Sequence, residues 1–567
     1  MTRDSEFWRG GAIPPGGTYI RLPVRSLVVL FALGACVRHS PAESERTKPR
    51  LVVLIVIDQW PSWMFEREQK LYTGGLARLL REGAVVPAAD LPYANSFTAV
   101  GHATLGTGAP PRESGIVGNN WWRRDEQRER AAEYDPNAQP FLVNSALGSE
   151  MLSQEDGSSS RALRVEGVAD VLRRATQGRA HSVAIALKAR AACFVAGKRP
   201  DIAIWYESSA GGMTTSKAYA KDTPPWLIEH AHEAPVSRYF DAVWQPRDAA
   251  LLARVTGMPD DAPGEQSDHG LGATFPHAIA ASKSPARAII ETPFADDMIA
   301  HTAIVAIDRL ALGNDDVPDF LAISFNAHDY AGHNWGPDSW EVLDLTLRLD
   351  VTLGKLFDVL DKRLGKGGWA VIVTSDHGAT PIVERTRVSG ARRIPLPEIE
   401  RVAEQAIETQ LGQKGPWVAR LVSGNIYLTP KFQAVSARDA ALDAAVKALS
   451  QIPNIAIVGR TDRFSAGCED ERDVMRAICL GTVPGQAGEL FIYPIAGSLI
   501  SDSKGGTAHD APFDDNRRVP ILVKAPGLAP QRGTGSVLQV APTLAALLGV
   551  PPPPAAKAPT LFEIQRR

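Results

Sequence analysis

The chain has 567 residues, of which 44% are hydrophobic and 22% are charged. These fractions exclude a disordered or fibrous protein and predict a globular one with a large hydrophobic core. A formal net charge of -3 argues against a nucleic-acid-binding platform, because such surfaces are strongly basic.

The N-terminus, residues 1–36, has the pattern of a secretory signal. Arg21 and Arg25 precede an apolar run over 27–33, which is too short for a spanning helix of about 20 residues. The stretch Leu33-Gly-Ala-Cys36 resembles a bacterial lipobox, in which the cysteine is lipidated after cleavage. The alternative is an ordinary signal peptide with an incidental cysteine. We therefore expect an exported protein that is periplasmic, is anchored to the outer membrane through Cys36, or is secreted.

Three apolar runs further along the chain share one design, because each leads to an aspartate. They are residues 51–58, 320–329 and 370–376, which end at Asp58, Asp329 and Asp376. Short β-branched runs bounded by turns predict buried parallel strands. Ligands of open α/β sheets bind outside the carboxyl ends of such strands. We therefore expect the three carboxylates to meet at one edge of one sheet.

The pattern of the remaining chain predicts alternating strands and helices around two insertions. Further strands are expected at 182–187, 424–428, 489–493 and 519–524, and helices at 75–83, 293–312, 339–364 and 541–549. The predicted divisions are a signal over 1–36, a linker over 37–49, core segments over 50–194, 291–384 and 501–567, and insertions over 195–290 and 385–500. This organisation predicts an α/β fold with a mostly parallel sheet.

The cysteines fit an oxidising compartment. Cys468 and Cys479 lie in or near a polar, acidic loop and could form a disulfide that closes a short loop. The alternative is two unpaired thiols. Cys193 is then left without a partner and is expected to be buried near a basic pair, Lys188 and Arg190.

Two pairs of histidine and aspartate indicate divalent metal binding. Asp329 and His333 lie one helical turn apart, so a helix would place both on one face. Asp376 and His377 are adjacent at a predicted strand end. Each pair alone is common as a surface turn or a helix ion pair, but their joint placement at strand ends favours a two-metal site. Imidazole and carboxylate together suit zinc, and paired ions stabilise attacking and leaving oxygens.

The segment Asn95–His102 supplies a candidate nucleophile. Thr98 stands where a helix is expected to begin, and it either caps that helix or attacks phosphorus with help from a metal and the helix dipole. The two roles are compatible. Ser96 is the rival hydroxyl, and His102 is expected to be structural.

These motifs together resemble the alkaline phosphatase superfamily. The matching positions are Val-Ile-Asp58, Thr98-x-x-x-His102, Gly115-Ile-Val-Gly-Asn119, Asp329-x-x-x-His333, Ser-Asp376-His377-Gly and His509. Lys188-Ala-Arg190 and the stretch Gly-Asn119-Asn120-Trp-Trp resemble the PafA-type, threonine-using members. The resemblance runs from about Leu51 to Pro552 and implies an alkaline-phosphatase-like three-layer α/β/α core.

The resemblance also implies a set of site residues. One zinc ion would be held by Asp329, His333 and His509, and a second by Asp58, Asp376, His377 and the Thr98 hydroxyl. Two Zn²⁺ ions are therefore the expected cofactors, and Thr98 would carry a phosphothreonine intermediate. The phosphate-binding residues would be Asn119, Lys188 and Arg190, with Asn120 as the alternative to Asn119.

The cation pair bears on the class of ester. A phosphate monoester carries one negative charge more than a diester, so Lys188 and Arg190 favour small-molecule phosphate monoesters. The leading hypothesis is a zinc-dependent alkaline phosphatase, with a monomer favoured. Alternatives are a phosphodiesterase or nucleotide pyrophosphatase on the same two-zinc scaffold, and a non-catalytic zinc- or phosphate-binding lipoprotein. No Cys-x-Pro-x-Arg segment occurs, which argues against a formylglycine-dependent sulfatase.

Overall fold

A computed structural model describes residues 48–148 and 157–563 of the chain. The predicted signal segment, Cys36 and all of the predicted linker except residues 48 and 49 lie outside these ranges. Within these two ranges, no helix is both long enough and apolar enough to cross a bilayer.

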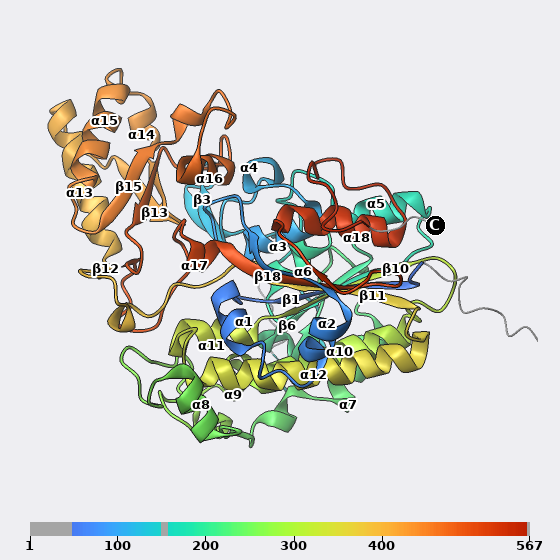
Figure 1. The fold of residues 1–567 in the computed structure, drawn as a ribbon. Coiled ribbons are helices and arrows are strands. Elements are labelled where there is room, and N and C mark those ends of the chain that lie inside the picture. Colours follow the sequence, from blue (N-terminus) through green and yellow to red (C-terminus); the bar gives the residue numbers. More distant parts are fainter. Residues whose placement is uncertain (1–47, 149–156, 564–567) are drawn as a thin grey trace, which may run out of the picture. The chain divides into compact units, whose positions relative to one another are not determined.

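Within the described ranges, nine strands form one central sheet with the order β19-β2-β18-β11-β1-β10-β5-β6-β7 (Figure 1). Their bounds are β1 Leu51–Ile57, β2 Ala84–Asp90, β5 Ser182–Ala186, β6 Ile202–Glu207, β7 Gly212–Thr214, β10 Asp319–Phe325, β11 Trp369–Thr374, β18 Arg518–Lys524 and β19 Gln531–Arg532. The run from β11 to β6 is parallel, whereas β18 and β7 join it antiparallel. The prediction of an α/β fold with a mostly parallel sheet is confirmed.

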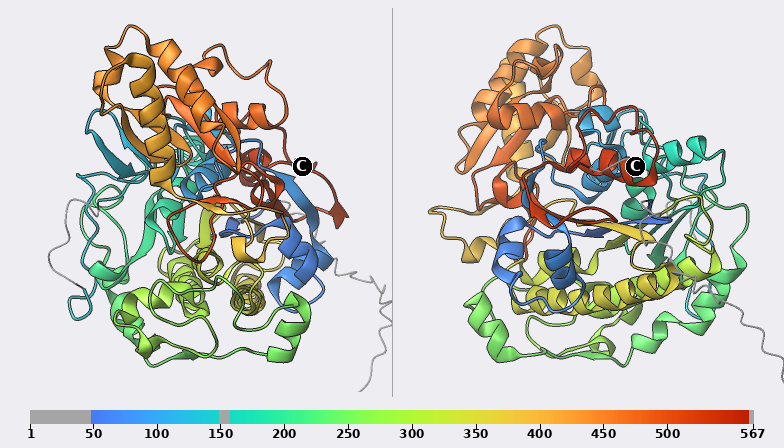
Figure 2. Two further views of the ribbon diagram at one scale, coloured as in Figure 1. Left: turned by 90° about the vertical axis from the view of Figure 1, so that its left-hand side faces the viewer. Right: turned by 45° about the vertical axis from the view of Figure 1, so that its right-hand side comes forward.

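Both faces of the sheet are buried, which explains why β1 is apolar at every position. Val53 and Ile55 face one hydrophobic core, and Val52 and Leu54 face the other. The first core is covered by α2 (Gly75–Glu82), α10 (Pro293–Arg309) and α12 (Trp340–Leu364), and the second by α3 (Thr98–Thr107), α5 (Val168–Ala175), α6 (Ala189–Val195) and α18 (Val540–Leu548). Figures 1 and 2 show these helices on opposite sides of the sheet, as three layers.

One predicted division differs from the structure. The segment 195–290 was expected to be an insertion, yet its first part supplies β6 and β7 of the central sheet. Trp205 packs into one core and Tyr206 into the other, so this strand is buried on both faces. The strand escaped prediction because these aromatic side chains and the glycines after them obscure the aliphatic pattern seen in β1.

Residues 385–500 contain a second sheet with its own hydrophobic core. The sheet has the order β13-β14-β16-β15, with bounds β13 Val418–Val422, β14 Asn425–Leu428, β15 Ile455–Arg460 and β16 Leu490–Pro494. It packs against α13 (Leu396–Leu411) and α15 (Arg438–Leu449), which lie together in Figure 1. Cys468 and Cys479 form a disulfide in this region, and Cys193 is a free, buried thiol on α6.

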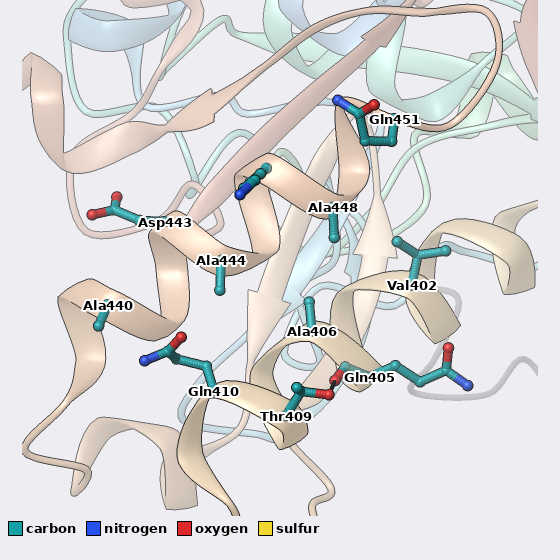
Figure 3. Close-up of a pocket in the computed structure, with 11 residues that line it drawn as sticks. Val402, Gln405, Ala406, Thr409, Gln410, Ala440, Asp443, Ala444, Ala448 and Gln451 are labelled. Carbon is teal, nitrogen blue, oxygen red and sulfur yellow. Dashed lines mark hydrogen bonds between the residues drawn. The ribbon is translucent and has the colours of Figure 1, made fainter.

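A groove of about 780 Å³ runs between α13 and α15 (Figure 3). Small side chains such as Ala406, Ala444 and Ala448 leave the space, and Gln405 and Gln410 stand at its rim. None of the predicted metal or phosphate ligands lines it. The chemistry predicted from the sequence therefore has to be sought at the central sheet.

Candidate metal centre

The carboxyl ends of three neighbouring strands bring the predicted ligands together. In the sheet register Ile57 of β1 pairs with Phe325 of β10, and Val56 pairs with Thr374 of β11, so the three strands end at the same level. Asp58 follows β1 directly, and Asp376 follows β11 after one serine. Asp329 lies in the first turn of α11 (Ala327–Trp335), which begins just after β10.

The seven predicted metal ligands include two groups that could each hold a metal ion. One group is Asp329, His333 and His509, and the other is Asp58, Asp376 and His377; within each, the candidate ligand atoms lie within 4.8 Å of one another. The rings of His377 and His509 stack with their centroids 3.8 Å apart, so the two groups are direct neighbours. Segments separated by hundreds of residues thus form one centre.

Backbone carbonyl groups orient all three histidines. Nδ1 of His333 donates to Thr507 O at 2.7 Å, Nδ1 of His377 donates to Gly378 O at 3.0 Å, and Nδ1 of His509 donates to Ser96 O. A carbonyl oxygen can only accept, so the proton of each neutral ring must sit on Nδ1. Each Nε2 is then left with a lone pair, which is the arrangement that metal-binding histidines require.

Three buried ligand atoms face one another and lack hydrogen-bond partners. Oδ1 of Asp58, Oδ2 of Asp376 and Nε2 of His377 are all buried and have no hydrogen-bond partner among the described residues. His377 Nε2 lies 3.4 Å from Asp58 Oδ1 and 3.3 Å from Asp376 Oδ2. Burial and the neighbouring Asp329 and Asp376 raise the pKa of Asp58 to about 6. Because unpaired lone pairs of this kind are costly, the donor set fits a bound cation.

Lys188 provides one of the positive charges at this centre. It precedes α6, and its Nζ donates to Asp58 Oδ2 at 2.9 Å and also to Asp329 Oδ2. Burial alone would raise the pKa of Asp329, but His333 and Lys188 outweigh it and hold that pKa well below its ordinary value. One ammonium group cannot neutralise Asp58, Asp329 and Asp376 together, so further cations are needed.

Thr98 is the first residue of α3 and is only 1% exposed. The residue that caps the helix is Phe97, so of the two roles considered for Thr98 the N-cap is wrong. Its Oγ1 lies 3.4 Å from Lys188 Nζ. The helix packs closely against Asp376, since a Cβ at Gly101 would lie only 2.3 Å from the Asp376 carbonyl oxygen. This close packing places the hydroxyl beside the metal ligands.

The predicted phosphate ligands lie near the same helix start. Oδ1 of Asn119 accepts from Ala99 N at 2.9 Å, which leaves its NH₂ group free to donate elsewhere. Asn120 begins β3 (Asn120–Arg123), and its backbone oxygen accepts from Ser423. This placement favours Asn119 over Asn120. Arg190 lies in the first turn of α6, where its Nε donates to Glu133 Oε1 at 3.3 Å.

Several residues at the centre were not predicted from the sequence. Gln59 Nε2 donates to Asp329 Oδ1 at 2.8 Å, and Asn326 Nδ2 donates to Asp58 Oδ2 at 2.7 Å. His102, which was expected to be structural, has its Nδ1 2.9 Å from Thr98 O and 3.2 Å from Asp376 Oδ2, so it lies between the start of α3 and a metal-ligand carboxylate. Asn326 directly follows β10 and Gln59 is the second residue after β1, and this position at a strand end is the signal that could have identified them.

Comparisons with known proteins agree with this geometry. The model of the family described as type I phosphodiesterase / nucleotide pyrophosphatase matches residues 52–476. Alkaline phosphatase PafA of Elizabethkingia meningoseptica is 28% identical over 536 residues, covering 91% of this chain and 94% of its own length. Alkaline phosphatase PhoV of Synechococcus elongatus is 31% identical over 386 residues, covering 66% of this chain and 68% of its own.

The fold is also found among solved structures. The crystal structure of wild-type PafA has a TM-score of 0.80 at 26% identity, covering 91% of this chain and 98% of that one. The family match spans most of the chain, and both relatives described above are alkaline phosphatases. The chain therefore belongs to the type I phosphodiesterase / nucleotide pyrophosphatase family, within the alkaline phosphatase superfamily, and is a phosphatase.

Proposed function

We propose that the protein is a zinc-dependent alkaline phosphatase that hydrolyses phosphate monoesters through a phosphothreonine on Thr98. The observation that carries this proposal is the position of Lys188. Its ammonium group contacts a carboxylate from each metal-ligand group and lies 3.4 Å from the Thr98 hydroxyl. A cation at this point can bind a phosphate that is being attacked by Thr98.

Asp329, His333 and His509 would hold one zinc ion, and Asp58, Asp376, His377 and Thr98 Oγ1 the other. The mixture of imidazole and carboxylate donors, with each Nδ1 already bonded to a carbonyl group, supports zinc. When bound, the ions would lower the pKa of the attacking oxygens and offset the charge of the leaving oxygen. His333 is the most accessible of these ligands, with 34% of its side chain exposed, so substrate would approach from its side.

The chain's own residues would bind and orient the phosphoryl group. The NH₂ group of Asn119 and the first turn of α3 offer N–H donors beside Thr98, and a helix N-terminus favours a bound anion. Lys188 and Arg190 add two positive charges. Together these donors match the non-bridging oxygens of a phosphate dianion.

The reaction would proceed in two displacements at phosphorus. Thr98 Oγ1 gives its proton to solvent and forms a bond to phosphorus while the bond to the ester oxygen breaks. The leaving oxygen takes up a proton from solvent, so the alcohol departs. Water then attacks the phosphothreonine, which breaks the bond to Oγ1, returns a proton to Thr98 and releases inorganic phosphate. The tight packing around Thr98 keeps its hydroxyl aligned in both steps.

A solved variant of PafA supports the choice of four site residues, which are Thr98, Asn119, Lys188 and Arg190. That variant carries substitutions at a threonine, an asparagine, a lysine and an arginine of PafA. The separation between the threonine and the asparagine, and that between the lysine and the arginine, equal those of Thr98 to Asn119 and Lys188 to Arg190. The match supports Asn119 as the donor in preference to Asn120.

Phosphodiester hydrolysis is the second candidate, because the matching family is described by that activity. The two functions differ in what must surround the phosphorus. A diester has one charge fewer and a second organic group, so a cation pair contributes less to its binding. The ratio of monoester to diester hydrolysis therefore decides between them.

Replacing both Lys188 and Arg190 by alanine should lower kcat/KM for p-nitrophenyl phosphate by about a hundredfold or more, since two charge-assisted hydrogen bonds are lost. Hydrolysis of bis-p-nitrophenyl phosphate should fall by less than about tenfold. Both rates can be measured in the same zinc-replete buffer.

The pair Lys198 and Arg199 offers a matched control, because the same two charges lie in the loop after α6 and away from the metal ligands. Its double alanine variant should keep wild-type rates on both esters. A wild-type enzyme that preferred the diester would contradict the monoesterase proposal.

A further inference from the structure

Glu133 is a buried carboxylate for which the mechanism above has no use. It is 7% exposed, and its Oε1 accepts from Arg190 Nε at 3.3 Å. Its Oε2 has no hydrogen-bond partner among the described residues. A buried carboxylate needs compensation, and the guanidinium of Arg190 supplies it here.

The backbone around Glu133 is fixed to the same elements that carry the phosphate ligands. It follows a hairpin of β3 and β4 (Arg128–Ala131), in which Asn120 pairs with Ala131. At the base of this hairpin Ala132 N donates to Asn119 O at 2.8 Å, and Ser159 N donates to Glu133 O at 2.8 Å. The hairpin base therefore joins Asn119, which contacts α3, to Glu133, which contacts α6.

The contact with Glu133 uses only one edge of the Arg190 side chain. A guanidinium group has five N–H donors in a rigid plane, and Glu133 takes the one at Nε. In the structure as described over 48–148 and 157–563, Nη1 and Nη2 of Arg190 form no hydrogen bond or ion pair. Fixing the Nε edge of a planar group also fixes the direction of its Nη edge.

We propose that Glu133 is a positioning residue that holds Arg190 with its Nη groups directed at the phosphoryl group of a monoester. The inference rests on the proposed function, since it concerns how that substrate is bound. A free arginine side chain would lose rotamer entropy each time it bound phosphate. Glu133 removes that cost in advance, and the hairpin base fixes Arg190 and Asn119 relative to each other.

Replacing Glu133 by alanine should lower kcat/KM for p-nitrophenyl phosphate about tenfold and raise the inhibition constant of inorganic phosphate by a similar factor. The rate on bis-p-nitrophenyl phosphate should change by less than about twofold. Glu133→Gln should retain most of the monoester activity, because its amide oxygen can still accept from Nε. Thermal unfolding checks that each variant is folded.

A double-mutant cycle separates positioning from a structural role. In an Arg190→Ala background, Glu133→Ala should cost less than about twofold, because there is no guanidinium left to orient. Equal losses in both backgrounds, or equal losses on both esters, would overturn the inference. If Glu133→Ala does not fold, Glu133→Asp replaces it in the same cycle. The shorter side chain keeps the negative charge but is too short to contact Arg190 Nε.

Glu129 is the matched control, because it lies on the same hairpin and its Oε2 accepts from Arg420 Nε at 3.2 Å on the exposed surface. Glu129→Ala should leave both rates and phosphate inhibition unchanged.

The failure of the proposed function can be distinguished from the failure of the role proposed for Glu133. If Arg190→Ala by itself leaves the monoester rate unchanged, the proposed phosphate binding is wrong. If Arg190→Ala lowers that rate but Glu133→Ala does not, only the role of Glu133 is wrong.

Discussion

Thr98→Ala should reduce turnover of p-nitrophenyl phosphate by roughly 10³-fold or more, because the substitution removes the hydroxyl that is proposed to form the covalent intermediate. Thr98 begins α3, is buried and lies beside Lys188 and the metal ligands. Thr98→Ser keeps a hydroxyl at the same point and should retain part of the activity. Steady-state rates at saturating zinc measure the difference.

Ser96 is the natural control for this prediction. It lies two residues before Thr98, its hydroxyl is buried, and its backbone oxygen accepts from His509. Ser96→Ala leaves that backbone contact in place and should keep near-wild-type activity. Wild-type enzyme that is quenched in acid during turnover should carry phosphate on Thr98. The Thr98→Ala variant should carry none. Loss of turnover in Ser96→Ala, with activity kept in Thr98→Ala, would reverse the assignment of the nucleophile.

His377→Ala should remove one of the two metal ions and lower activity by at least about 10²-fold. Nε2 of His377 lies 3.4 Å from Asp58 Oδ1 and 3.3 Å from Asp376 Oδ2, and it supplies the only imidazole of that ligand group among the described residues. Because the ion binds only the folded chain, its loss should also lower the thermal unfolding temperature in zinc-replete buffer. Metal analysis and thermal unfolding give readouts that do not depend on activity.

The exposed His232 on α7 (Pro225–Glu233) is a suitable control, since replacing it removes an imidazole that is not part of either ligand group. His232→Ala should keep the metal content and the unfolding temperature of the wild type. A His377→Ala protein with full metal content and unchanged stability would show that this group does not hold an ion.

The parts of the fold that the sequence predicted are those with local patterns. The apolar runs before Asp58 and Asp376 have the length and β-branched composition of buried strands, and the structure has β1 and β11 there. One general rule about the carboxyl edge of parallel sheets then places the aspartates together. Strand β6, next to the edge of the sheet, was not predicted. It is buried on both faces, but its aromatic residues obscure the aliphatic pattern that identifies β1 and β11.

The parts of the site that escaped prediction depend on tertiary contacts. Glu133 has no local signal, since only the docking of the hairpin base against α6 brings it to Arg190. Gln59 and Asn326 lie near strand ends, which is a sequence signal, but only tertiary contacts determine that each donates to a metal-ligand carboxylate. His509 was identified through a family resemblance, because its loop has no periodic pattern and is held by contacts such as that to Ser96.

Titrating zinc into the metal-free protein tests the central claim most directly, since the claim is that two cations at one sheet edge activate Thr98. We expect p-nitrophenyl phosphate hydrolysis to rise from near zero and to level off when about two equivalents of zinc have bound. Full activity in the metal-free protein, or a plateau at a single equivalent, would contradict the account.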